Sequence, residues 1–333
     1  MTRLPDPSRP LAADAAHAAF AAMLDGDVDD ADIAGFLRAL AARGETATEI
    51  AAAAAELRAR MLAIAAPAGA IDLCGTGGDG SHSLNVSTAA AFVVAAAGVP
   101  VAKHGNRAAS SRCGAADVLE ALGIALDLAP DRLEACLAEL GVAFLFAQRH
   151  HPALARLAPV RRALGIRTIF NLLGPLASPA RVTRQLVGVF APAWLAPMAE
   201  AGVALGLERV LAVHGAGLDE IAVHAPSELL WATPAGLVSE RFSPEAEGLA
   251  LHPRAAIAGG DAAHNARMLE AVLAGRADTP ELRAYRAIVI ANAAAALRLA
   301  GRAQGWPEAI GLARAKIDDG SAADRLARLA AFR

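Results

Sequence analysis

Residues 71–107 read IDLCGTGGDGSHSLNVSTAAAFVVAAAGVPVAKHGNR, and this stretch decides the fold. It predicts a buried strand over residues 71–74, an apolar helix over 88–98 and a second strand over 99–102. The loop after the first strand holds four glycines in the six residues 75–80. Glycine lets backbone N–H groups converge on an anion, and the helix start adds unpaired N–H groups and a positive dipole end. This β-loop-α-β unit therefore predicts a phosphate site.

A break at residues 67–69 separates two patterns. The pattern before it is helical throughout, with Asp30 expected to cap the second helix and Thr46 and Glu49 at capping-box spacing before the third. These helices are expected over residues 11–24, 33–43 and 50–64. After the break, short Val/Ile/Leu runs alternate with helices, which indicates an α/β sheet covered by helices. The expected elements there cover residues 99–103, 117–122, 130–140, 186–190, 194–205, 210–214, 265–273 and 281–300.

The stretch over residues 148–179 differs from its surroundings, because it holds two histidines and five arginines and shows no strand pattern before Arg181. His150 and His151 lack a third metal ligand at suitable spacing, so we expect them to line a cleft or a surface. Arg161 has the planar guanidinium that binds a carboxylate through two hydrogen bonds. An exposed helical arginine is an equally good interpretation of this residue.

Composition excludes several classes of protein. The 333 residues are 55% hydrophobic and carry a net charge of −3, whereas nucleic-acid-binding domains are usually strongly basic. Three cysteines are too few for a disulfide framework or a zinc site, which fits a reducing cytoplasm. The apolar run over residues 88–102 is shorter than the roughly 20 residues that a membrane span needs. The N-terminus lacks a signal-peptide core, so we expect a cytoplasmic protein with no membrane partner.

Polar residues around the glycine loop refine the expected ligand. Asp79 is unfavourable for a bare phosphate, so we expect it to face ribose hydroxyls or a metal-bound water. The loop is neither a P-loop nor the dinucleotide-binding fingerprint. Asn85, Ser87 and Thr88 place amide and hydroxyl groups at the helix start, where Ser87 could equally be an ordinary helix cap.

Two charged groups complete the expected site. Lys103 leaves a predicted strand two residues before Gly105, which makes it a candidate phosphate partner, with a solvated strand-end lysine as the alternative. Asp219 and Glu220 follow a strand and a glycine turn. Adjacent carboxylates beside a phosphate site favour Mg²⁺, although an acidic pair at a helix start is the simpler interpretation.

At this point the motifs resemble a known family. The chain is similar to the anthranilate phosphoribosyltransferases, which join anthranilate to phosphoribosyl pyrophosphate (PRPP), and the similarity covers residues 18–329. The matching runs lie at residues 75–80, 85–88, 103–107, 116–123, 150–153, 161–171, 174–176, 214–220 and 292–297.

The resemblance implies a fold and partners. The fold would be a small helical domain plus a larger α/β domain with a central mixed sheet, like that of nucleoside phosphorylases. The helical domain would comprise residues 1–69 with a contribution from about 150–180, and the catalytic domain residues 70–149 and 181–333. The substrates would be PRPP and anthranilate, with two Mg²⁺ ions per subunit, in a cytoplasmic homodimer that serves tryptophan biosynthesis and binds no nucleic acid.

The resemblance also implies residue roles. PRPP would contact Gly75, Thr76, Gly77, Gly78, Asp79, Ser83, Asn85, Val86, Ser87, Thr88, Lys103, His104, Gly105, Asn106 and Ser111. Anthranilate would contact Gly75, His104, Asn106, His151 and Arg161. Mg²⁺ would bind Ser87, Asp219 and Glu220. No single catalytic acid or base is expected.

Some positions depart from the family pattern. His82 near the phosphates is unexpected and would make PRPP binding sensitive to pH. Cys113 stands where a hydroxyl is commoner, Arg112 keeps the usual charge, and Ala108 lacks a hydroxyl. Three alternatives remain open at this stage: a pyrimidine nucleoside phosphorylase, a phosphoribosyltransferase for another aromatic acceptor, and a non-catalytic relative that binds nucleic acid.

Overall fold

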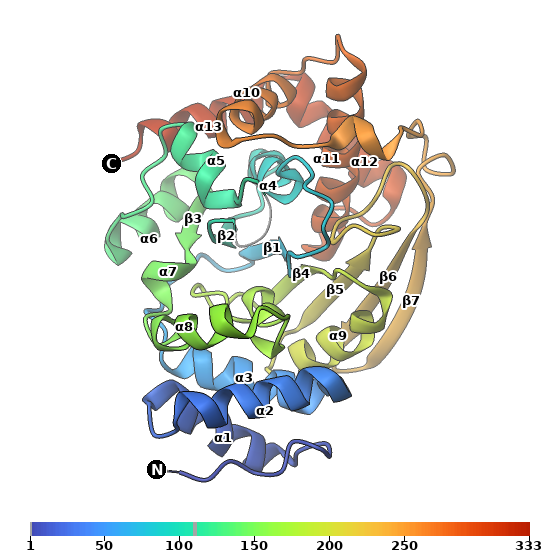
Figure 1. Ribbon diagram of the computed structural model, residues 1–333. Coiled ribbons are helices and arrows are strands. Elements are labelled where there is room, and N and C mark those ends of the chain that lie inside the picture. The colour runs from blue at the N-terminus through green and yellow to red at the C-terminus, as the bar shows by residue number, and fades with distance from the viewer. Residues whose placement is uncertain (1, 109–111) are drawn as a thin grey trace.

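A mixed sheet of seven strands lies at the centre of the fold, as the computed structural model in Figure 1 shows. The structure describes residues 2–108 and 112–333. In spatial order the strands are β3 (Val142–Phe146), β2 (Val101–Gly105), β1 (Ile71–Gly75), β4 (Arg184–Gly188), β5 (Arg209–His214), β6 (Ser227–Thr233) and β7 (Gly236–Phe242). The first five are parallel, and β6 and β7 add antiparallel pairs at one edge.

Two apolar clusters pack on the two faces of this sheet. The cluster on one face includes α1 (Ala13–Asp25), α2 (Asp30–Arg43), α3 (Ala47–Ala59), α8 (Leu154–Leu164) and α9 (Leu195–Ala204). The cluster on the other includes α4 (Val86–Ala96), α5 (Ala115–Ala121), α6 (Pro130–Leu140), α10 (Ala262–Leu273), α11 (Pro280–Leu299), α12 (Trp306–Asp318) and α13 (Ser321–Ala331). In Figure 1, α1, α2 and α3 form the N-terminal end of the molecule beside α8.

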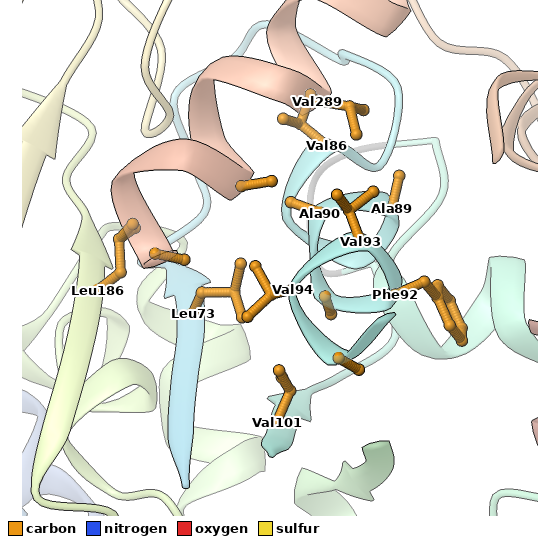
Figure 2. Packing of buried hydrophobic residues seen from close by; sticks show 14 of the residues in the cluster. Leu73, Val86, Ala89, Ala90, Phe92, Val93, Val94, Val101, Leu186 and Val289 are labelled. Atoms are coloured by element: carbon orange, nitrogen blue, oxygen red, sulfur yellow. The ribbon is translucent and has the colours of Figure 1, made fainter. Parts of the chain in front are cut away.

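Side-chain alternation along the strands explains the two clusters. Leu186 of β4 belongs to the cluster around α4, whereas Val187 belongs to the cluster around α9. Neighbouring residues of a strand face opposite sides, so a strand buried on both faces is apolar at nearly every position. Figure 2 shows Leu73 and Val101 beside α4, whose alanines let the helix lie close to the sheet, and Leu186 beside α11.

The fold class expected from the sequence is confirmed: a helical N-terminal part and a larger α/β part with a mixed sheet. No strand occurs within residues 148–179, where α8 is followed by two short 3₁₀ turns, η1 (Ile169–Asn171) and η2 (Gly174–Leu176). The division into domains at residues 69, 149 and 180 stays a prediction. Among the described residues, no helix is both long and apolar enough to span a membrane.

Several local predictions need correction. The sequence pattern did not reveal β3, β6, β7, α12 and α13. The edge strand β7 is largely exposed and interrupted by polar residues, so it lacks an apolar run. The capping box of Thr46 and Glu49 is confirmed. Asp30 is not a cap, because it is the first residue of α2 and Asp29 precedes it as the N-cap.

Candidate active site

The carboxyl ends of β1 and β5 bring the glycine loop to the acidic pair. Parallel strands end at the same edge of a sheet, which is where ligands bind in such folds. The space between these strand ends is narrow, because a Cβ added to Gly75 would lie 2.1 Å from Oδ2 of Asp219. A Cβ on Gly188 at the end of β4 would lie 1.6 Å from the carbonyl oxygen of Asp219. Only glycine fits at either position.

Hydrogen bonds join the glycine loop to the acidic pair. The N–H of Gly77 donates to Oδ2 of Asp219 at 2.7 Å, and the N–H of Asp219 donates to Oδ2 of Asp79 at 3.3 Å. Gly77 has a φ of +69°, a backbone conformation that favours glycine. The loop and the acidic pair, separated by about 140 residues in the chain, therefore form one unit.

The start of α4 joins the same unit. Here the N–H of Ser87 donates to Oε1 of Glu220 at 3.0 Å. The helix begins at Val86, two residues before the predicted start, and its N-cap is Asn85 rather than Ser87. Ser87 is therefore not the cap, and a carboxylate from a distant loop accepts one of the free N–H groups that a cap would satisfy.

The carboxylates of this unit are buried close together. Burial and the negative charge of Asp219 raise the pKa of Glu220 to about 8. Burial and the charge of Asp79 raise the pKa of Asp219. Buried carboxylates that repel one another favour a bound cation. Among the described residues no group of three or more His, Cys, Asp and Glu side chains has metal-binding geometry. The pair of Asp219 and Glu220 has the carboxylates that could hold Mg²⁺, which binds through one or two carboxylates plus substrate phosphates.

Lys103 is a buried lysine and not a solvated one, with only 4% of its surface exposed. Its Nζ donates to the carbonyl oxygen of His104 at 3.2 Å. Its positive charge lowers the pKa of Glu220 against the effect of burial, so the ammonium lies near the acidic pair. The alternative that Lys103 is a solvated lysine at a strand end is therefore excluded.

The side chain and the backbone carbonyl of Asn85 both accept hydrogen bonds from other residues. Its Oδ1 accepts a hydrogen bond from Nδ2 of Asn265 at 2.9 Å, and its carbonyl oxygen accepts one from the hydroxyl of Tyr285 at 3.1 Å. The Sγ of Cys113 lies 3.7 Å from the same Oδ1. Cysteine thus keeps a weak contact to Asn85 at the position where the resemblance led us to expect a hydroxyl.

Two buried histidines, His104 and His151, form another part of the candidate site. The rings of His104 and His151 lie 5.1 Å apart, and Nδ1 of His104 lies 3.1 Å from the carbonyl oxygen of Gly174. Burial lowers the pKa of His151 to about 4 and that of His104 well below its usual range. Both rings are therefore neutral at pH 7. The Nε2 of His104 is buried and has no protein partner among the described residues.

Arg161 of α8 is half-buried, which excludes the fully exposed alternative. Burial lowers the pKa of its guanidinium, which lies 5.7 Å from the ring centroid of Phe170. Within the described part of the chain it forms no ion pair with a carboxylate. Asn106, in contrast, is exposed, and its Oδ1 accepts hydrogen bonds from the N–H of Arg107 and from Gln148. Ser111 lies outside the described residues.

Family models match almost the whole chain. The model described as the helical bundle domain of a glycosyl transferase family matches residues 6–61, and the a/b domain of that family matches residues 68–323. An anthranilate phosphoribosyltransferase of Novosphingobium aromaticivorans is 55% identical over 323 residues, which are 97% of this chain and 96% of that protein. The chain belongs to the anthranilate phosphoribosyltransferase family.

Solved structures of this family have the same fold. The anthranilate phosphoribosyltransferase of Thermus thermophilus superposes with a TM-score of 0.92 at 42% identity, covering 98% of this chain and 96% of that one. The Saccharomyces cerevisiae enzyme in complex with PRPP and Mg has a TM-score of 0.87 at 27% identity, with 96% and 92% coverage. The same yeast enzyme in complex with 4-fluoroanthranilate has a TM-score of 0.84 at 25% identity, with 96% and 93% coverage.

Sequence reasoning gave no individual role to Arg167, which follows α8. Its guanidinium donates to the carbonyl oxygen of Gly78 in the glycine loop and lies 4.3 Å from the ring centroid of Phe190. The side chain thereby links the segment after α8 to the glycine loop. The only signal in the sequence was its position inside a run that matched the family.

The residues that follow the glycine loop are also held in place by backbone contacts. Ser83 forms a β-bridge with Ala258, and the carbonyl oxygen of His82 accepts from the N–H of Gly259 at 2.8 Å. His82 itself is exposed and has a φ of +49°. The pH sensitivity expected from His82 stays a prediction.

Proposed function

We propose that this chain transfers the phosphoribosyl group of PRPP to the amine of anthranilate and releases pyrophosphate, as a step of tryptophan biosynthesis. The chain is a transferase of the glycosyltransferase kind, and anthranilate phosphoribosyltransferase activity follows from its family. One observation carries the proposal for the site: the glycine loop and the start of α4 both donate to the acidic pair, through Gly77 and Ser87.

The PRPP side combines fixed N–H donors with one buried cation. We place PRPP among residues 75–79, Ser83, 85–88 and 103–106, with Ser111 as a further expected contact. When bound at Ser87, Asp219 and Glu220, Mg²⁺ would neutralise the pyrophosphate charge, and two ions per subunit remain our expectation. The yeast enzyme in complex with PRPP and Mg supports this assignment.

Anthranilate carries a neutral amine beside a carboxylate, and the acceptor side of the site has to bind both. We assign anthranilate to Gly75, His104, Asn106, His151 and Arg161. A half-buried guanidinium without an ion-pair partner in the described chain suits the anthranilate carboxylate. The neutral histidines add no charge that would compete for it. The yeast complex with 4-fluoroanthranilate supports an acceptor of this class.

Positioning and electrostatics dominate the proposed reaction. The amine attacks C1 of the ribose while the bond from C1 to the pyrophosphate oxygen breaks, and the new C–N nitrogen then releases one proton to the departing pyrophosphate or to solvent. An aryl amine is already neutral at pH 7, so no strong base is needed before the attack. Lys103 and the loop N–H groups stabilise the charge that develops on the departing pyrophosphate. The strand ends hold the amine in line with the breaking bond.

The three alternatives are disfavoured by the same findings. Relatives named anthranilate phosphoribosyltransferase cover nearly the whole chain, which argues against a nucleoside phosphorylase and against a different acceptor. A net charge of −3 disfavours nucleic-acid binding. A cytoplasmic homodimer remains part of the proposal.

Anthranilate fluorescence tests the activity directly. Purified protein with PRPP and Mg²⁺ should consume the fluorescence with time, whereas omission of Mg²⁺ or PRPP should abolish the loss. Glu220→Ala should reduce the rate at least about 100-fold, because it removes a buried metal ligand. Glu270→Ala, which changes an exposed carboxylate of α10, is the matched control and should react like the wild type. No fluorescence loss at high enzyme concentration would overturn the proposal.

A further inference from the structure

One fully buried carboxylate, that of Asp72 in β1, has no role in the proposed reaction. Asp72 is 0% exposed in the middle of β1, between Ile71 and Leu73. Aspartate is rarely fully buried, because taking its charge out of water is costly unless hydrogen bonds or an opposite charge compensate. The position therefore requires a reason beyond packing.

The carboxylate of Asp72 in β1 accepts a backbone hydrogen bond from β2 beyond the registered pair of these two strands. The registered pairing of β1 with β2 is Ile71 with Val101, whereas β2 and β3 pair from Val101 and Val142 as far as Gly105 and Phe146. Beyond the first pair, Oδ1 of Asp72 accepts the N–H of His104 at 3.1 Å. The Sγ of Cys74 lies 3.9 Å from the other carboxylate oxygen.

The peptide that Asp72 holds carries one residue from each half of the site. Neighbouring strand residues project to opposite faces, so the peptide between Lys103 and His104 sets the direction of both side chains. Lys103 in turn donates to the carbonyl oxygen of His104. The ring of His104 contacts Gly174 and His151 on the acceptor side.

We propose that Asp72 is a positioning residue, which fixes the Lys103–His104 peptide so that Lys103 meets the PRPP phosphates and His104 meets the acceptor. The inference rests on the proposed function, since it takes the roles of Lys103 and His104 from there. Electrostatics agree with the geometry: burial raises the pKa of Asp72 to about 6, and Lys103 and the N–H of His104 act to lower it.

Two substitutions separate the hydrogen bond from the charge. Asp72→Asn keeps an oxygen for the N–H of His104, and its amide can donate to the sulfur of Cys74. Asp72→Val has a shape suited to a buried strand but leaves the His104 N–H unpaired. Cys136→Ala is the control, since Cys136 is a buried residue of α6 whose Sγ donates to the carbonyl oxygen of Val142, whereas Gln185 of β4 hydrogen-bonds Asp72 itself and cannot serve.

We expect Asp72→Val to lower kcat/KM for PRPP at least about tenfold, mainly through KM, because an unpaired buried N–H displaces the peptide. Asp72→Asn should stay within about threefold of the wild type, and Cys136→Ala should change thermal stability without changing KM. Equal losses in Asp72→Asn and Asp72→Val, unchanged kinetics in Asp72→Val, or the same loss in Cys136→Ala would overturn the proposal.

Amide hydrogen exchange at His104 gives a readout that does not depend on the reaction. Slow exchange in the wild type and in Asp72→Asn is expected even if the acceptor proves to be another compound. Fast exchange of this amide in the wild type would contradict the contact itself. If Asp72→Val does not fold, Asp72→Asn decides alone: near-normal kinetics with a protected His104 amide supports the proposal, and a folded variant with a tenfold loss overturns it.

Discussion

At single positions of the site, glycine is required because a larger residue would not fit, and not only because of the backbone conformation. Gly75 lies so close to Asp219 that even a methyl group would move the carboxylate. The sequence predicts a phosphate site at this loop, because four glycines share it, and this stays a prediction. It could not predict the contact with Asp219, because this contact joins positions more than 140 residues apart.

Gly75→Ala should therefore lower kcat/KM for PRPP at least about tenfold and weaken the dependence on Mg²⁺, because Asp219 must shift away from the added methyl. Steady-state kinetics over a range of Mg²⁺ concentrations measure this effect. Gly35→Ala is the control, since its Cβ in α2 would meet nothing within 4 Å. Wild-type kinetics in Gly75→Ala would show that the close contact has no functional consequence.

Arg161 is expected to act on the acceptor alone. Arg161→Ala should raise KM for anthranilate at least about tenfold and leave KM for PRPP within about twofold, because a charge-assisted pair with the carboxylate is lost. Arg161→Lys should recover only part of the loss, since an ammonium cannot bind both carboxylate oxygens in a plane. Arg162→Ala, an exposed neighbour, serves as the control. A rise in KM for PRPP with an unchanged KM for anthranilate would contradict this prediction, because it would place Arg161 on the PRPP side of the site.

At the scale of elements, the sheet edge gathers segments that come from distant parts of the chain. Alternating apolar runs predicted the central strands, because these are buried on both faces. The exposed strand β7 and the polar-interrupted β6 gave no such signal, so the antiparallel edge was missed. The start of α4 at Val86 was also misplaced, since the N–H of Ser87 donates to Glu220 from another loop rather than to a local cap.

The segment after α8 and the glycine loop are joined by one side chain. Arg167→Ala should raise KM for PRPP about threefold to tenfold, because Gly78 loses its hydrogen-bonded partner and the loop becomes less ordered before PRPP binds. Kinetics and proteolysis of the loop would measure the two effects, with Arg162→Ala again as the control. An unchanged KM together with unchanged proteolysis would rule out a role in ordering the loop.

At the scale of the whole molecule, buried neutral histidines make stability depend on pH. The folded-state pKa of His151 lies near 4, below the ordinary value near 6.5 of an unfolded chain, which corresponds to about 3 kcal/mol. Because the folded pKa is lowered, this stability is present above pH 6.5 and is lost as pH falls toward 4. Urea unfolding between pH 7 and 4 should show a smaller loss in His151→Phe than in the wild type. Half-buried His264 provides the control, and a loss in His151→Phe as large as in His264→Asn would contradict this explanation.

The central claim is that the glycine loop, the start of α4 and the acidic pair form one PRPP–Mg²⁺ site. Calorimetric titration of PRPP into wild type and Glu220→Gln, each with Mg²⁺ and with EDTA, tests it most directly. We predict that the wild type binds PRPP at least about tenfold more tightly with Mg²⁺, and that Glu220→Gln loses most of this difference. Equal affinity of the wild type in Mg²⁺ and EDTA, or an undiminished Mg²⁺ effect in Glu220→Gln, would contradict the account.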